Sequence, residues 1–283
     1  MFRPEIQQLL ALIRTELDEE QDLYLVGGAV RDALLDRKIN DLDFAMGHDP
    51  TTLAKRVAKR LDAGFFVLDD ARHTARVLFR SSQAEILPLD FVQFTGGNLK
   101  QDLRHRDFTM NAMAVSICDH EKIIDPLQGL PDLNAGLLRL VSPDALLEDP
   151  VRVLRGIRLA LSFDFDFVEE LHAQMHAAAG SLPTTSYERQ RDEFFKILEG
   201  SAPGKGIRLC REYQVIDTLI PPLMEQYHIP ASPPHELPLF DHTLEAVTNF
   251  GNLIDWICHR AEVLIEPPWW IAYAGAELFS FSS

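Results

Sequence analysis

A glycine pair between two strand-like segments constrains this chain more than any other feature of its 283 residues. Residues 24–26 (Tyr-Leu-Val) form an apolar run that predicts a buried strand, Gly27-Gly28 ends it, and Ala29 to Leu35 predicts a short helix. Asp41-Leu42-Asp43 then alternates polar and apolar residues as a strand does, so both carboxylates point to one face. Two carboxylates side by side repel each other unless a cation lies between them.

The same segment offers donors for an anion. Backbone without side chains at Gly27-Gly28 approaches a phosphate closely, and N–H groups at a helix start favour negative charge. Arg31, one turn into the helix, adds a guanidinium suited to two-bond phosphate contact. Mg2+ is usually held by one or two carboxylates together with substrate phosphates. Each motif alone is more often a turn or a solvated strand end, but together they predict phosphoryl or nucleotidyl transfer with Mg2+ on Asp41 and Asp43.

This combination resembles the bacterial tRNA nucleotidyltransferase/poly(A) polymerase family, the CCA-adding type within the polymerase-beta-like superfamily. That family opens with Gly-Gly-x-Val-Arg-Asp followed by Asp-x-Asp, as residues 27–43 do here. The resemblance covers residues 20–200 well and 201–260 loosely. It implies an α+β fold, in which a small nucleotidyltransferase head with a mixed or antiparallel sheet precedes all-helical neck and body domains. It also implies that Gly28 and Arg31 hold the triphosphate.

Two further motifs of the head follow. Asp90 lies on an apolar strand-like segment, and it is either a strand-edge acid or a third carboxylate beside the metal pair. Residues 104–112 resemble the family signature Arg-Arg-Asp-Phe-Thr-x-Asn-Ala, with His105 replacing the first Arg. The resemblance implies that Arg106 contacts the nucleotide or its triphosphate.

A stripe of charged residues marks the next helix. Pro150 suits a first helical turn, and Asp149, Arg152, Arg155 and Arg158 recur every three residues along one face. Such a stripe is usually a solvated face, but three arginines without interleaved acids favour an anionic ligand. The segment matches the family motif Glu-Asp-x-x-Arg. By that resemblance, Asp149 and Arg152 read the Watson–Crick edge of the incoming base, and Arg155 and Arg158 support them or touch phosphates.

The predicted organisation has three parts. We expect a catalytic head over 1–140, a helical neck for base recognition over 141–200, and a helical body with an incomplete HD-like tail over 201–283. Strands are expected at 65–68, 75–80, 84–94 and 122–124, and helices at 5–18, 53–61, 168–179, 187–198, 207–213 and 215–219. The proline-rich stretch 221–238 is expected to be a linker or loop.

The tail begins like an HD-type metal domain without completing it. His235 and His242 resemble its lead-in, but the later His-Asp pair does not follow, and two histidines alone make a poor metal site. We therefore expect a truncated or diverged tail without HD hydrolase activity.

Bulk properties narrow the class of protein. The net charge of −16 and the pI near 5.0 argue against a broad nonspecific nucleic-acid surface, although a local basic groove is compatible with them. No apolar run is long enough to span a bilayer. Cys118, Cys210 and Cys258 lack metal-ligand spacing, which favours a reducing cytoplasm. The sequence leaves the oligomeric state open.

The resemblance implies a template-independent enzyme that adds C and A to the tRNA 3′ end from CTP and ATP and releases pyrophosphate. In that reading Asp41, Asp43 and Asp90 are the catalytic carboxylates. Narrower alternatives are CC-only addition, A-only addition or poly(A) synthesis. The connection from Phe94 to Arg106 is short where many members carry a flexible loop associated with switching from C to A. An inactive RNA- or nucleotide-binding module is the alternative from another class, although it predicts a replaced Asp41 or Asp43.

Overall fold

The computed structural model describes residues 1–258 apart from 19–20, 82–84 and 120–121. The chain forms two compact units: Met1–Arg152 with Phe163–Ala178, and Val153–Ser162 with the chain from Ala179 onward. This division differs from the predicted boundaries near residues 140 and 200, because one helix contributes to both units. The three-part domain scheme stays a prediction.

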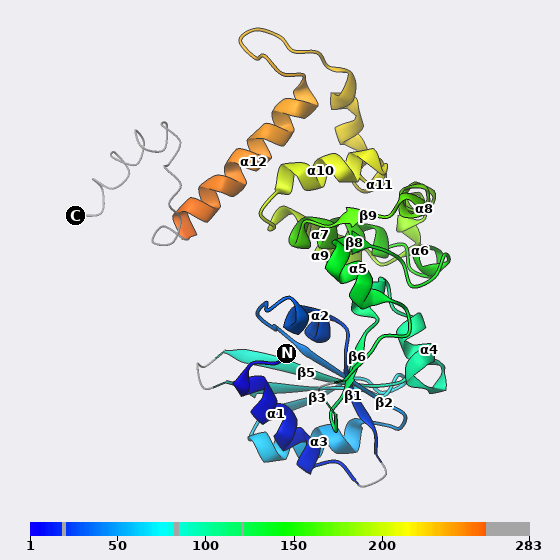
Figure 1. Ribbon diagram of the computed structural model, residues 1–283. Coiled ribbons are helices and arrows are strands. Elements are labelled where there is room, and N and C mark those ends of the chain that lie inside the picture. Colours follow the sequence, from blue (N-terminus) through cyan, green and yellow to red (C-terminus); the bar gives the residue numbers. More distant parts are fainter. Residues whose placement is uncertain (19–20, 82–84, 120–121, 259–283) are drawn as a thin grey trace, which may run out of the picture. The chain divides into compact units, whose positions relative to one another are not determined.

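The first unit is built on a seven-stranded mixed sheet (Figure 1). Its strands are β1 Leu23–Val26, β2 Leu42–Met46, β3 Gly64–Asp69, β4 Thr74–Arg80, β5 Ile86–Gln93, β6 Ala114–Ser116 and β7 Ile123–Ile124. Their order across the sheet is β3-β4-β5-β2-β1-β6-β7. Within this sheet β2 and β5 pair in parallel, and the other neighbours are antiparallel. The predicted α+β head with a mixed sheet is confirmed, and all four strands expected after the glycine motif are present.

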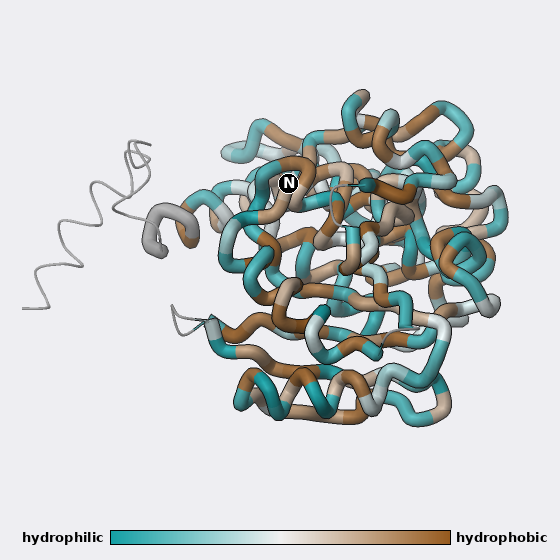
Figure 2. Tube along the Cα trace, turned by 60° about the horizontal axis from the view of Figure 1, so that its bottom comes forward, coloured by the Kyte–Doolittle hydropathy of each residue, from teal (hydrophilic) through white to brown (hydrophobic). Residues whose placement is uncertain are grey.

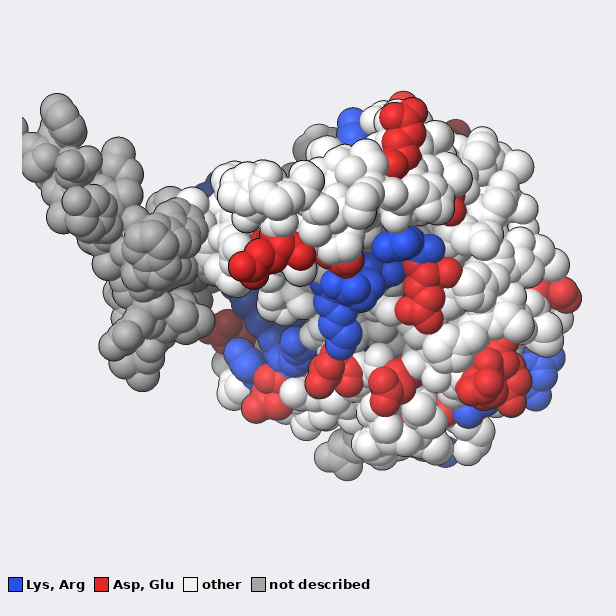
Figure 3. Space-filling view, turned by 90° about the horizontal axis from the view of Figure 1, so that it is seen from above, with Lys and Arg blue, Asp and Glu red and all other residues white. Residues whose placement is uncertain are grey.

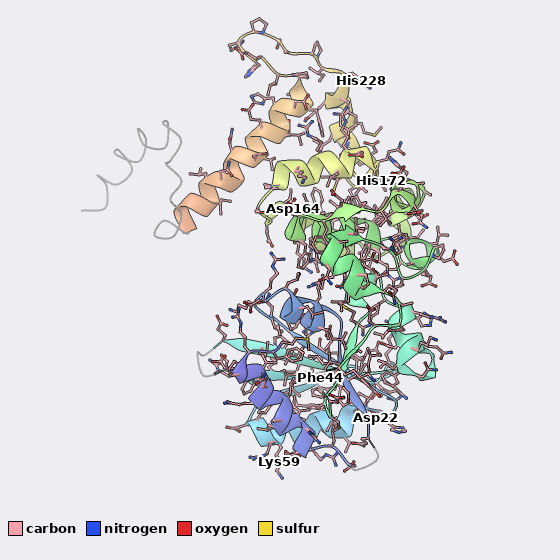
Figure 4. All side chains as sticks on the ribbon, viewed as in Figure 1. Asp22, Phe44, Lys59, Asp164, His172 and His228 are labelled. Atoms are coloured by element: carbon pink, nitrogen blue, oxygen red, sulfur yellow. The ribbon has the colours of Figure 1, made fainter. Side chains whose placement is uncertain are left out.

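Apolar residues on both sides of the central strands form the core of this sheet. Leu25, Phe44 and Phe91 are fully buried, and the rings of Phe44 and Phe91 stack with centroids 4.9 Å apart. Figure 4 shows Phe44 among the side chains of the sheet. Because β2 is covered on both faces, Asp43 near its amino-terminal end is the one residue of this strand that is partly exposed.

Short helices cover the sheet and lead into the next part of the chain. They are α1 Pro4–Thr15, α2 Gly28–Leu34, α3 Thr51–Leu61, α4 Leu99–Arg104, α5 Gly129–Ala135, α6 Ala145–Glu148 and α8 Glu169–Ala179, with the three-ten turns η1 Thr95–Gly97 and η2 Thr109–Asn111. In Figure 1, α3 lies below the sheet and α2 above it. Hydrophilic and hydrophobic residues alternate along the helices, as expected where one face packs on a core (Figure 2). The two-residue strands β8 Leu137–Leu138 and β9 Asp166–Phe167 pair in parallel.

The second unit is helical. It contains most of α7 Arg152–Phe163, then η3 Leu182–Thr184, α9 Tyr187–Leu198, α10 Pro203–Glu212, α11 Val215–Leu219, η4 Pro221–His228 and α12 Leu239–Cys258. Tyr213, Ile216 and Phe240 are buried in its core. The stretch 221–238 was expected to be a linker or loop. This is wrong for Pro221–His228, which form a three-ten helix that begins with two prolines. The fixed φ of proline suits the first positions of such a helix. None of the described helices combines the length and apolar character needed to cross a bilayer.

Candidate active site

Three neighbouring strands bring two carboxylates and one guanidinium together at one point of the sheet. Asp43 on β2 lies opposite Asp90 on β5, and Asp90 lies opposite Arg76 on β4. Asp41 comes one residue before β2 and is exposed, whereas Asp43 and Asp90 are half-buried. The structure therefore brings Asp43 and Asp90 together across two strands that are far apart in sequence.

Arg76 was not identified from the sequence. Its Nε lies 2.6 Å from Asp90 Oδ1 and its Nη2 lies 2.7 Å from Asp90 Oδ2. Hydrogen bonding to Asp90 raises the pKa of Arg76, and the charges of Asp41 and Asp43 add to that rise. The acidic cluster thus contains a fixed cation. The sequence carried no signal for it, because its partner lies 14 residues away on another strand.

The glycine turn packs directly against Arg106. Gly27 has φ of +75°, and a Cβ placed there would lie 2.6 Å from Arg106 Nη1 and 3.6 Å from Asp43 Oδ2. The positive φ favours glycine, and any side chain there would displace the Arg106 guanidinium. Arg106 Nη2 donates to Asp102 Oδ2 at 3.3 Å, and Asp102 Oδ1 accepts the Thr95 N–H at 3.0 Å. The turn, Arg106 and Asp43 therefore meet at Gly27. The predicted contact of Gly28 with the triphosphate stays a prediction.

Arg31 lies inside a network that joins the two head motifs. Its Nε is 2.8 Å from Asp32 Oδ1, and its Nη1 donates to Asn111 Oδ1. Asn111 Nδ2 donates to Asp107 Oδ1 at 3.0 Å, and the Arg31 guanidinium lies 4.5 Å from the ring centroid of Phe163. With a side chain only 11% exposed, Arg31 mainly links protein groups here. Its predicted triphosphate contact stays a prediction.

Arg152 is anchored at the start of α7. Its Nη2 donates to the His105 carbonyl at 2.7 Å and its Nη1 to the Ala145 carbonyl at 3.0 Å. Its Nε lies 3.8 Å from Asp149 Oδ2, so the two predicted base-reading residues are neighbours. The predicted pair is brought together, although the structure does not test its role toward a base.

The remaining arginines of the stripe differ from each other. Arg158 Nε lies 2.6 Å from Glu193 Oε2, and Glu193 is 8% exposed, with Lys196 Nζ 3.6 Å from its other oxygen. Arg155 is exposed. The sequence showed no acids interleaved within the stripe, but the acid that pairs with Arg158 comes from α9, 35 residues later. The predicted phosphate or supporting roles of Arg155 and Arg158 stay predictions.

A cavity of about 750 Å3 opens within the first unit beside Arg106. Such a volume is typical of small-molecule sites. The charged and aromatic side chains along it are Arg72, His73, Phe94, Asp102, His105, Arg106, Glu148 and Arg152. Predicted nucleotide contacts Arg106 and Arg152 thus share one cavity, whereas Asp41, Asp43 and Asp90 do not line it.

The donor set suits a hard divalent cation that keeps other ligands. Within the described ranges, no three His, Cys, Asp or Glu side chains lie close enough to hold an ion together. Asp41 and Asp43 alone are two carboxylate donors, which fits Mg2+ bound also by water and substrate phosphates. Imidazole rings of His235 and His242 lie 4.9 Å apart between centroids but gather no third donor among these residues. The expectation about HD activity stays a prediction.

Charge on the surface is mixed. On the face shown in Figure 3, Lys and Arg side chains are bordered by Asp and Glu side chains rather than forming one broad basic field. The net charge of −16 fits this pattern. Positive charge on this face is therefore limited to local patches.

Two family models match the chain. Residues 23–139 match the poly(A) polymerase head domain, and residues 164–227 match the probable RNA and SrmB-binding site of polymerase A. The chain belongs to the tRNA nucleotidyltransferase/poly(A) polymerase family. Within this family, the divalent metal expected at Asp41 and Asp43 is typical of the head.

Relatives in the family differ in what they add. The CC-adding tRNA nucleotidyltransferase of Geobacter sulfurreducens is 40% identical over 176 residues, which are 62% of this chain and 40% of that protein. The A-adding tRNA nucleotidyltransferase of Deinococcus radiodurans is 36% identical over 229 residues, 79% of this chain and 50% of that protein. The Thermotoga maritima CCA-adding enzyme complexed with tRNA(CCA) has a TM-score of 0.74 at 31% identity, over 90% of this chain and 59% of that one. The chain therefore spans about half the length of the relatives it matches.

Proposed function

We propose that this chain carries the catalytic part of a tRNA nucleotidyltransferase that adds C and A to the tRNA 3′ end from CTP and ATP, releasing pyrophosphate. The observation that carries the proposal is the meeting of Gly27, Arg106 and Asp43, since a Cβ on Gly27 would lie 2.6 Å from Arg106 and 3.6 Å from Asp43. A guanidinium suited to phosphate next to a carboxylate suited to a metal, in a family of nucleotidyltransferases, supports the proposal.

In this proposal, different residues bind the metal, the triphosphate and the base. Asp41 and Asp43 hold a divalent metal, which when bound stabilises the charge that develops in an in-line displacement at the α-phosphate. Arg106, held by Asp102, faces the triphosphate, and Gly27 gives it room. Asp149 and Arg152 together present an acceptor and a donor to the base edge. Arg152 is fixed for this by two backbone carbonyls.

The experiment is primer extension with each nucleoside triphosphate supplied separately. The primers are tRNAs that end before, within and after the CCA sequence. Stepwise addition of two C and one A, followed by a stop, supports the proposal. Unlimited A addition identifies a poly(A) polymerase instead, and nucleotide binding without extension identifies a non-catalytic binding module.

CC-only addition is the second candidate, favoured by one observation. The connection from Phe94 to Arg106 is filled by η1 and α4, and the Asn98 side chain caps α4 by accepting the Gln101 N–H at 3.0 Å. No segment of this connection is long enough for the flexible loop that the resemblance associates with the change from C to A. The similar enzyme of Geobacter sulfurreducens is a CC-adding tRNA nucleotidyltransferase. In the same assay, CC-only addition is supported if the enzyme extends primers with CTP but does not add A from ATP to a primer that ends in CC.

A further inference from the structure

Arg76 contacts Asp90, one of the three predicted catalytic carboxylates, from the neighbouring strand β4. Its guanidinium donates one hydrogen bond to each oxygen of Asp90, at 2.6 and 2.7 Å. Such charge-assisted two-bond pairs are short and fix the orientation of both groups. The Asp90 side chain is 17% exposed and that of Arg76 is 38% exposed, so the pair is only partly screened by water.

The strand register places this pair beside the metal carboxylates. Asp90 lies opposite Asp43, and the charges of Asp41 and Asp43 reach the Arg76 guanidinium. Even so, no three acidic or other metal-binding side chains of the described chain lie close enough to share one ion. Asp90 is therefore directed to Arg76 instead of completing a three-carboxylate site with Asp41 and Asp43.

We propose that Arg76 is a positioning residue that keeps Asp90 out of the metal site of the free protein, so that a divalent ion binds firmly only together with a nucleotide. This inference rests on the proposed function. The inference goes beyond the proposed function because it attributes the order in which metal and nucleotide bind to one ion pair between β4 and β5.

The physical argument compares charges near the ion. Asp41 and Asp43 offer two negative groups, and Arg76 both neutralises Asp90 and repels a cation. A nucleoside triphosphate supplies the missing negative oxygens, which Mg2+ readily accepts beside one or two carboxylates. Without Arg76, the negative charge of Asp90 next to Asp43 is no longer balanced by a guanidinium, and attraction to the ion in this partly desolvated place increases.

Mn2+ binding to the nucleotide-free protein tests this directly, measured by electron paramagnetic resonance without any turnover. Arg76→Met is expected to tighten Mn2+ binding about tenfold or more, since a nearby charge changes by one unit. The double variant Arg76→Met/Asp90→Asn is expected to return to wild-type affinity, because the released carboxylate is removed as well. Unchanged or weaker Mn2+ binding in folded Arg76→Met overturns the proposal, as does a double variant that stays tight.

Two further variants keep the test decisive. Arg80→Met is the matched control: it removes the same charge from the same face of β4, four residues or roughly 13 Å along the strand, and should leave Mn2+ affinity unchanged. Arg76→Lys keeps the charge but lacks the planar fork, so a smaller tightening is expected. If Arg76→Met does not fold, Arg76→Lys decides, and wild-type affinity in that variant overturns the proposal.

A nucleotide arm separates this inference from the proposed function. Calorimetry measures binding of a non-reactive α,β-methylene analogue of CTP with and without Mn2+. Coupling between the two ligands is reciprocal, so Mn2+ should strengthen analogue binding in the wild type and do so less in Arg76→Met. Absence of analogue binding to the wild type contradicts the proposed function. Mn2+-dependent analogue binding that Arg76→Met leaves unaltered contradicts only the role of Arg76.

Discussion

Asp43 has a more constrained setting than Asp41, although the sequence presents them as equals. Asp41 is exposed before β2, whereas Asp43 lies within the strand, opposite Asp90 and near Gly27. A carboxylate held by neighbouring strands keeps its orientation without losing side-chain entropy at each turnover. We therefore expect Asp43 to contribute more to catalysis than to folding.

Replacing Asp43 by Ala should lower nucleotide addition on the order of a thousandfold or more, because one ligand of the catalytic metal is lost. The measurement is single-turnover extension of a tRNA primer, with circular dichroism to check the fold. Asp166→Ala is the matched control, since it removes an exposed acid from the second Asp-x-Asp of the chain, Asp164-Phe165-Asp166. Near-normal activity of folded Asp43→Ala would contradict the assignment.

Gly27→Ala tests the close approach of the turn to Arg106. The added Cβ would meet Arg106 Nη1 at 2.6 Å, and the positive φ of +75° disfavours any side chain. Displacement of Arg106 should raise KM for the nucleotide about tenfold, which corresponds to about 1.4 kcal/mol. Gly47→Ala is the control, because its Cβ would make an ordinary contact of 3.8 Å with Phe94. Equal KM values for the two variants would show that Arg106 is not positioned by the turn.

At the scale of elements, local patterns revealed the strands, most helices and the Asp-x-Asp pair. Period-two alternation places Asp43 on a strand end, and helical spacing placed α9 at its observed bounds, Tyr187–Leu198. Pairings between distant elements were not readable. The bonds of Arg76 to Asp90 and of Arg158 to Glu193 depend on which strand or helix becomes a neighbour. Local periodicity carries no such information.

The junction of α6 and α7 carries the predicted choice of base. Asp149→Ala should reduce discrimination of C and A over U and G by roughly ten- to a hundredfold, since a lost paired contact costs about 1–3 kcal/mol. Incorporation rates of the four nucleotides on one primer measure this. Asp144→Ala, which removes an exposed acid just before α6, is the control and should leave selectivity unchanged. If Asp149→Ala lowers all four rates equally, its role is structural.

The contact of α7 with α9 should matter for stability instead. Arg158→Met removes the 2.6 Å charge-assisted bond to Glu193, whose residue is only 8% exposed, so the free energy of unfolding should fall by about 1–3 kcal/mol. Arg155→Met changes an exposed position of the same helix and should stay within about 0.5 kcal/mol of wild type. Chemical denaturation of both variants gives the comparison. Similar losses in the two would contradict the brace between α7 and α9.

At the scale of the whole molecule, the acidic charge limits where the proposed tRNA substrate could bind. Residues 201–283 contain four basic and ten acidic residues, so this part repels phosphate on average. Arg72, Arg106 and Arg152, by contrast, line one cavity of the first unit. Few phosphates are then neutralised, and tRNA binding should be weak and confined to the acceptor end.

The salt dependence of tRNA binding tests this distribution of charge. For about three or four neutralised phosphates, the slope of log K against log salt concentration should be roughly −2 to −3. Arg72→Met should make this slope shallower by the contribution of about one neutralised phosphate, because this exposed arginine lines the cavity. Phe240 and Leu244 of α12 are buried, so truncation before α12 would disturb the packing of the helical unit. The contribution of residues 201–283 to RNA binding is therefore tested by substitution. Lys205→Met/Arg208→Met on α10 should leave the slope unchanged. A steep slope that this double variant abolishes, or a footprint reaching the anticodon, would show that the helical unit carries the RNA.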